Sequence, residues 1–107
     1  QATSRIGATQ VLLAGDAAGL TNPITGAGIA SAVVSGRLAG EAAARLVGGE
    51  ASAGDDYAEE IGDLYGASLA RALSRRRELM AIYARRQEPT VAELRRGWIA
   101  FEAYWAA

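Results

Sequence analysis

The sequence predicts a mainly α-helical chain in which one short β-strand precedes three helices, and three features support this fold class. An apolar run ends at Gly15 and Asp16, which is typical of a strand followed by a turn. A long alanine-rich stretch stops at Gly48, and glycine is the usual residue just beyond a helix. Pro89 interrupts the remaining helical pattern, because proline cannot continue a helix.

The predicted strand covers residues 11–13, is expected to have no neighbouring strand within the chain, and is followed by two glycine-containing turns. In open α/β sheets ligands bind beyond the carboxyl ends of strands, so the carboxylate of Asp16 would lie at such an edge. Gly26 and Gly28 open the first helix and would leave backbone amides available at its start. These groups suit a ligand with hydroxyls at one end and an anionic edge at the other. The simpler alternative is a strand, turn and helix whose glycines serve only tight packing.

The same residues resemble a known motif. Residues 15–19, Gly-Asp-Ala-Ala-Gly, and 22–29, Asn-Pro-Ile-Thr-Gly-Ala-Gly-Ile, look like the second flavin-binding motif of FAD-dependent oxidoreductases, most closely the geranylgeranyl reductase group. The resemblance covers residues 1–47 and implies the C-terminal portion of an FAD/NAD(P)-binding α/β fold. It implies that Asp16 binds the ribityl chain of FAD. The implied cofactor-binding residues are Gly15, Asp16, Pro23, Thr25, Gly26, Ala27, Gly28 and Ile29.

The resemblance also indicates a reaction class. Related aromatic-ring hydroxylases usually carry His directly after Gly-Asp-Ala-Ala, whereas this chain has Gly19. The implied activity of the intact enzyme is therefore reduction of prenyl carbon–carbon double bonds, with helix-start amides stabilising negative charge on reduced flavin. No catalytic residue is assigned. The alternatives are a segment of an FAD-dependent monooxygenase or halogenase-like enzyme, a helical interaction module without catalysis, and a peripheral membrane adaptor.

The cofactor site implied by this resemblance is only half present. The sequence contains no strand followed by a G-x-G-x-x-G turn, which would hold the pyrophosphate of FAD. We therefore expect a C-terminal segment that works with an N-terminal FAD-binding domain and a substrate domain. Alone, the chain is expected to be inactive and to form homo-oligomers, with the helices from Asp55 onward supplying most of the contact. The expected location is the cytoplasm, with peripheral membrane contact through a lipid substrate as a further partner.

Composition excludes several kinds of site. The chain has no Cys and no His, and all 11 basic residues are Arg. Nucleophilic triads, Cys/His zinc sites, Lys Schiff bases and a P-loop lysine are thereby ruled out, and no metal site is expected. The net charge of −1 argues against indiscriminate binding to nucleic acid. With 50% hydrophobic but only 7% aromatic residues, the core of the isolated chain should be thin.

The first helix is expected from Gly26 to Val47. Small residues recur along it every four positions, and we expect this small-residue ribbon to pack against a sheet rather than to form a membrane dimer motif. Charged residues are spaced for i,i+4 pairing on a solvent face. The ribbon consists of Gly28, Ala32, Gly36, Gly40 and Ala44, and the charges are Arg37, Glu41 and Arg45.

The remaining half, residues 50–107, is expected to be a helical tail beyond a first domain of residues 1–49. Residues 50–54 would be a linker, and a second helix would run from Asp55 to Gln87 with acids in its first turns and arginines in its last, which complements the helix dipole. Thr90 and Glu93 match a capping box for a third helix. Its aromatic stripe favours core or interface packing, with a lipid tunnel or a membrane surface as the alternative. The stripe comprises Leu94, Trp98, Ile99, Phe101, Tyr104 and Trp105.

Overall fold

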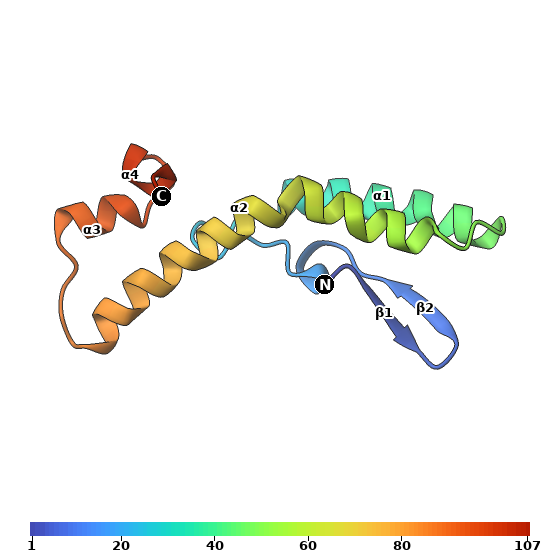
Figure 1. Cartoon of the computed structure of the whole chain (residues 1–107), viewed down its shortest axis with the longest axis horizontal. Coiled ribbons are helices and arrows are strands. Elements are labelled where there is room, and N and C mark those ends of the chain that lie inside the picture. The colour runs from blue at the N-terminus through green and yellow to red at the C-terminus, as the bar shows by residue number, and fades with distance from the viewer. The chain divides into compact units, whose positions relative to one another are not determined.

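A computed structural model describes all residues from 1 to 107 and is mainly helical, with 61% of residues in helices. The prediction of one strand and three helices was wrong in its counts, because the chain has two strands and four α-helices (Figure 1). The elements in chain order are β1 (Thr3–Ile6), β2 (Thr9–Leu12), the 3-10 turn η1 (Gly15–Ala18), α1 (Ile29–Val47), α2 (Ala53–Ala84), α3 (Val91–Arg96) and α4 (Glu102–Trp105).

The chain divides into two compact units, which are described separately. Unit 1 comprises residues 1–21 and 27–67, and unit 2 comprises residues 22–26 and 68–107. The division falls within α2 rather than at the expected linker, so the compact units differ from the predicted boundary between residues 49 and 50.

In unit 1, β1 and β2 form an antiparallel hairpin. Thr3 pairs with Leu12 and Ile6 pairs with Thr9, and the turn between them contains Gly7 with a φ of 60°. The expectation that residues 11–13 lack a neighbouring strand within the chain was therefore wrong. The sheet has only these two strands, so the second edge of β2 stays without a strand partner.

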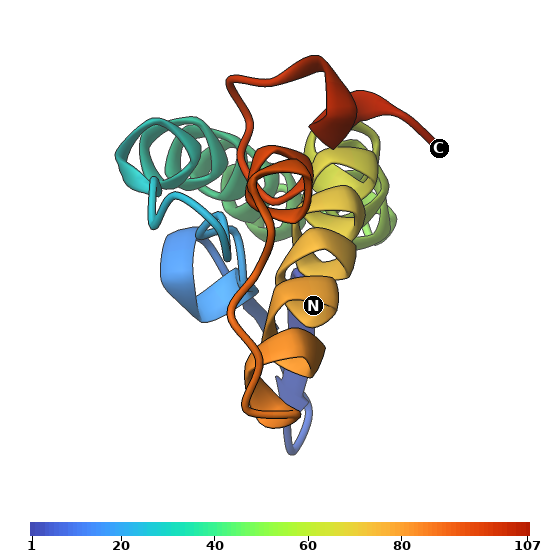
Figure 2. The same cartoon turned by 90° about the vertical axis from the view of Figure 1, so that its left-hand side faces the viewer.

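Helix α1 and the first part of α2 lie beside this hairpin in unit 1 (Figures 1 and 2). Leu38 and Ala42 of α1 and Tyr57 and Ile61 of α2 are buried there. The hydroxyl of Tyr57 donates a hydrogen bond to the carbonyl oxygen of Leu13, which ties α2 to the end of the hairpin. Burial raises the pKa of Tyr57 above its usual value, because the phenolate would lose solvation. This small core joins helices to the strand that precedes the motif.

Helix α1 ends at Val47 as predicted but begins at Ile29, three residues later than expected. Its ion pairs agree only in part with the expected spacing. Arg37 and Glu41 lie 2.8 Å apart, as predicted for i,i+4 pairing, whereas Arg45 pairs with Glu50 and Asp56 beyond the helix.

The small-residue ribbon does not pack against the sheet as expected. Gly28 is half-buried and the other four members are exposed. A side chain at Gly36 or Gly40 would meet no atom within 4 Å. The buried side of α1 instead carries Ser35, Leu38 and Ala42, so the ribbon leaves one side of the helix uncovered.

Helix α2 spans residues 53–84 rather than 55–87. Its first turn contains Asp55 and Asp56 as expected, but its last turn holds no basic residue, and Arg85 and Arg86 follow directly after the helix end. The helix ends before Pro89 because the amides of Arg86 and Gln87 bond back to the carbonyls of Tyr83 and Ile82. Arg86 occupies the left-handed position of this Schellman-type end, with a φ of 56°, where glycine is usual.

Unit 2 contains the second half of α2, α3 and α4. The predicted capping box is confirmed, because Thr90 Oγ1 accepts from the amide of Glu93 and the Glu93 carboxylate accepts from the amide of Thr90. The prediction of a single third helix was wrong, because residues 97–101 separate α3 from α4. Gly97 is buried, and a Cβ there would collide with the side chain of Leu79. The chain breaks where it must approach α2 closely.

A buried arginine fixes the C-terminal segment within unit 2. Arg75 is 5% exposed, and its Nε donates to the carbonyl of Tyr104 at 3.0 Å. Its guanidinium also donates to the carbonyl of Ala106 and to Glu78. Because every one of these bonds involves a charged group, they compensate for desolvation of the guanidinium.

Candidate functional site

The turn after β2 holds Gly15 in a conformation that favours glycine. Its φ is 56°, and its amide donates to Ser35 Oγ of α1 at 2.9 Å. A Cβ at this position would lie 3.1 Å from the Cβ of Ala32, so both the backbone and the neighbouring helix select glycine. Ser35 is fully buried and hydrogen-bonded. The turn is therefore anchored to α1, which holds the next residue at a fixed place.

That next residue, Asp16, is exposed in the first turn of η1. Its Oδ1 accepts a hydrogen bond from the hydroxyl of Thr21, and the chain provides no hydrogen bond to its Oδ2. Gly28 lies directly beside this pair, because a Cβ at residue 28 would be 3.3 Å from Asp16 Oδ1 and 3.1 Å from Thr21 Oγ1. The Gly-Asp turn and the glycine at the start of α1 thus meet in space.

The backbone amides at the start of α1 are the second feature of the site. Gly28 is the N-cap and no side chain caps the helix. In an α-helix the first amides have no intrahelical acceptor, which here applies to Ile29, Ala30 and Ser31. The helix begins three residues after the expected Gly26, because Asn22 holds the preceding residues in a turn. The side chain of Asn22 accepts hydrogen bonds from the amides of Ile24 and Thr25. Its backbone carbonyl accepts a hydrogen bond from the amide of Gly26.

The residues predicted for cofactor binding fall in both units. Gly15, Asp16, Ala27, Gly28 and Ile29 belong to unit 1, and the contact between Asp16 and Gly28 brings the two motifs of this unit together.

The other three, Pro23, Thr25 and Gly26, belong to the short segment 22–26 of unit 2. There the Pro23 carbonyl accepts a hydrogen bond from Arg76 at 3.0 Å, and Gly26 has a left-handed φ of 74°.

Sequence reasoning missed Thr21 and Ser35. Thr21 is the only hydroxyl residue between the two halves of the motif, so its position offered a weak signal. No sequence signal pointed to Ser35, because its hydrogen bond with the Gly15 amide depends on how α1 packs against the turn.

The chain also contains an open groove of about 540 Å³ away from Asp16. It lies between β2 and α1 and includes Gly40 of the small-residue ribbon. Its lining residues are Gln10, Val11, Leu12, Ala39, Gly40, Ala43, Leu46 and Val47. None of the predicted cofactor-binding residues lines this groove, so it is a separate apolar surface of unit 1.

No protein-family profile, curated protein or solved structure matches this chain. No group of three or more acidic side chains is placed to hold a metal ion. The candidate site therefore consists of Asp16, Thr21, Gly28 and the first amides of α1.

Replacing Gly28 by Leu is expected to lower the free energy of unfolding by about 1–3 kcal/mol, the usual cost of overpacking. The new side chain would press against Asp16 and Thr21. Urea denaturation followed by circular dichroism measures the effect. Gly36→Leu on the same helix is the matched control, since that position faces open space and should gain helix propensity. Equal stability changes in the two variants would contradict the close approach at Gly28.

Proposed function

We propose that this chain is the C-terminal segment of an FAD-dependent oxidoreductase similar to geranylgeranyl reductases. It would contribute the part of the site that binds the ribityl chain and the isoalloxazine ring. The observation that carries the proposal is the meeting of Asp16 with Gly28, which joins the two halves of the flavin-like motif at one place in unit 1.

The groups present fit the chemistry of a flavin. Asp16 is exposed and its Oδ2 is available to accept hydrogen bonds from ribityl hydroxyls. Glycine at position 28 leaves the carboxylate uncovered on that side. The uncapped amides of α1 and the positive end of its dipole suit an anionic ring edge.

In this proposal the cofactor, once reduced, would supply hydride to a carbon–carbon double bond of a prenyl chain and would itself be oxidised to FAD. Asp16 orients the cofactor by accepting hydrogen bonds, while Thr21 fixes the carboxylate rotamer. The amides of Ile29 and Ala30 stabilise negative charge near the helix start. We assign no proton donor to this chain.

One contact supports an alternative function. The bond between Thr21 and Asp16 would also suit a purely structural turn in a helical interaction module. Purification of the protein encoded by the complete reading frame separates the two functions. The oxidoreductase proposal expects a flavin absorption band and release of FAD on denaturation. A colourless protein that also fails to bind added FAD would favour the structural module.

A further inference from the structure

Unit 2 carries an excess of positive charge that the whole-chain net charge of −1 conceals. Residues 68–107 contain eight arginines and four glutamates: Arg71, Arg75, Arg76, Arg77, Arg85, Arg86, Arg95 and Arg96, against Glu78, Glu88, Glu93 and Glu102. Residues 22–26 add no charge. A positive field of this kind attracts anionic surfaces and falls off within a Debye length.

Much of this positive charge has no anionic partner within the chain. Glu78 is shared by Arg75 and Arg96, and Glu93 is occupied in the capping box. The remaining arginines form no ion pair with Glu78 or Glu93. Arg76 donates only to a carbonyl, and Arg77, Arg85 and Arg86 make neither an ion pair nor a side-chain hydrogen bond.

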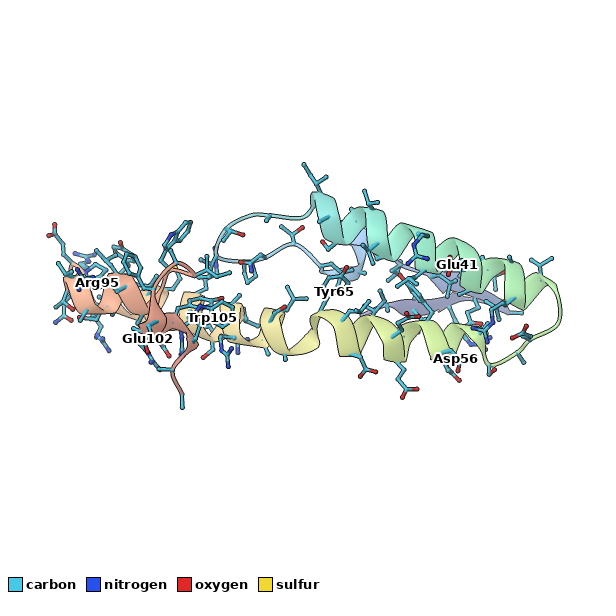
Figure 3. All side chains as sticks on the ribbon, turned by 90° about the horizontal axis from the view of Figure 1, so that it is seen from above. Glu41, Asp56, Tyr65, Arg95, Glu102 and Trp105 are labelled. Atoms are coloured by element: carbon cyan, nitrogen blue, oxygen red, sulfur yellow. The ribbon has the colours of Figure 1, made fainter.

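Two further arginines lie over exposed aromatic rings. The Arg71 guanidinium lies 5.3 Å from the ring centre of Trp105, and that of Arg95 lies 5.7 Å from the ring centre of Phe101. Figure 3 shows Arg95 on α3 and Trp105 on α4. These contacts place positive charge directly on apolar side chains, as is usual where a protein surface meets both charged and apolar groups.

Unit 2 contains an open apolar groove of about 420 Å³, and Arg95 is one of the residues that line it. Its lining residues are Leu79, Val91, Leu94, Arg95, Gly97, Trp98 and Phe101, and we call this set the α3 groove. Trp98 is 46% exposed and Val91 is 64% exposed. The sequence favoured core or interface packing for the aromatic stripe, and core packing holds for Tyr104 but not for Trp98, Phe101 or Trp105. These three side chains remain exposed within the chain and are available to a partner surface.

We propose that the α3 groove, with Arg95 in its lining, and the other arginines of unit 2 bind the anionic surface of a lipid bilayer. Trp98, Phe101 and the aliphatic lining would enter the boundary between headgroups and acyl chains, while Arg95 and Arg71 contact lipid phosphates. Contact would be peripheral, since no helix combines the length and the apolarity needed to cross a bilayer.

Two observations favour lipid over other anionic partners. Single-stranded nucleic acids need open ring faces on which bases stack, and here an arginine lies over one face of Trp105 and another over one face of Phe101, which leaves fewer faces for stacking. Much of the groove lining is aliphatic, namely Leu79, Val91 and Leu94. A second copy of the same surface would be repelled, because both surfaces carry unpaired arginines. This inference does not depend on flavin binding.

Vesicle binding by the 107-residue chain tests the proposal. The probes are phosphatidylcholine vesicles with about one third phosphatidylserine, and vesicles of phosphatidylcholine alone, at physiological salt. We expect co-sedimentation with the anionic vesicles only, and weaker binding at high salt. Both tryptophans of the chain, Trp98 and Trp105, belong to this region, so their fluorescence should shift to shorter wavelength on binding.

A double variant locates the binding surface. Arg71→Gln with Arg95→Gln should lower vesicle partitioning about 25-fold, at about fivefold for each charge near an anionic membrane. Arg71→Lys with Arg95→Lys should retain most of the binding, which distinguishes lost charge from lost folding. The matched control is Arg5→Gln with Arg37→Gln, which removes the same charge from unit 1.

Four results would overturn the proposal. One is equal binding to neutral and anionic vesicles, and another is equal loss in the unit 1 control. The third is tight binding to polyuridylic acid that displaces the vesicles, which would identify a nucleic-acid surface instead. Absence of any vesicle binding by the folded wild-type chain also contradicts it.

Discussion

Replacing Asp16 by Ala is expected to weaken FAD retention by the complete protein roughly ten- to a hundredfold. Hydrogen bonds to a charged group contribute about 1.5–3 kcal/mol, and the exposed carboxylate has one oxygen without a partner in the chain. The measurement is the flavin content of the purified protein, followed by titration of the apoprotein with FAD. Flavin content and affinity equal to those of the wild type would remove the central claim of the proposed function.

Two control variants separate a binding role from a structural one. Thr21→Val removes the internal hydrogen bond to Asp16 but keeps the carboxylate. Asp16→Asn keeps an oxygen acceptor for Thr21 but replaces Oδ2 by an amide nitrogen, which cannot accept a hydrogen bond. If Asp16 binds the ribityl chain, Asp16→Asn loses flavin while the unfolding free energy stays near that of the wild type. If Asp16 only stabilises the turn, Thr21→Val and Asp16→Ala destabilise alike.

Local sequence signals predicted the elements whose ends depend on nearby residues. The capping box at Thr90 and Glu93 was found because both partners lie within one helical turn. The end of α1 at Val47 followed from the glycines after it. The strand β1 was missed, because Thr3–Ile6 is exposed and polar and becomes a strand only by pairing with β2. The break between α3 and α4 was also missed, since it depends on the contact of Gly97 with Leu79.

In the candidate site, too, the sequence indicated only the residues that local backbone requirements define. Its glycines and Asp16 were recognisable because backbone conformation and close approach restrict those positions to few residue types. The partners Thr21 and Ser35 were not, because each is defined by a contact formed only after folding. Arg75 carried no signal for burial either. Its place depends on the carbonyls of Tyr104 and Ala106, which lie far along the chain.

The 107-residue chain alone is expected neither to turn over substrate nor to hold FAD tightly, and to associate into dimers or larger species. It contains no G-x-G-x-x-G turn, so the AMP portion of FAD would have no amide cradle. Light scattering after size exclusion, with a scan of the flavin absorption band, measures both properties together. A stoichiometric yellow complex would refute the first part of the prediction, and a folded monomer would refute the second.

The structure indicates which surface should drive this association. Although β1 covers one edge of β2, the other edge has no strand partner, and exposed strand edges promote pairing between chains. Helix α1 beside it presents Ile29 at 85%, Val33 at 68% and Val47 at 91% exposure. Contacts were expected mainly from residue 55 onward, and these exposed apolar residues of α1 offer a further contact surface in unit 1.

A charged substitution on α1 tests that assignment. Val33→Glu should shift the chain toward the monomer, because a carboxylate buried between copies would lose its solvation. Ala70→Glu on α2 is the control, since it adds the same charge to an exposed helical position of unit 2. If α1 forms the contact, only Val33→Glu lowers the mass measured by light scattering. An unchanged mass in Val33→Glu together with a monomeric Ala70→Glu would instead place the contact on α2, as the sequence first suggested.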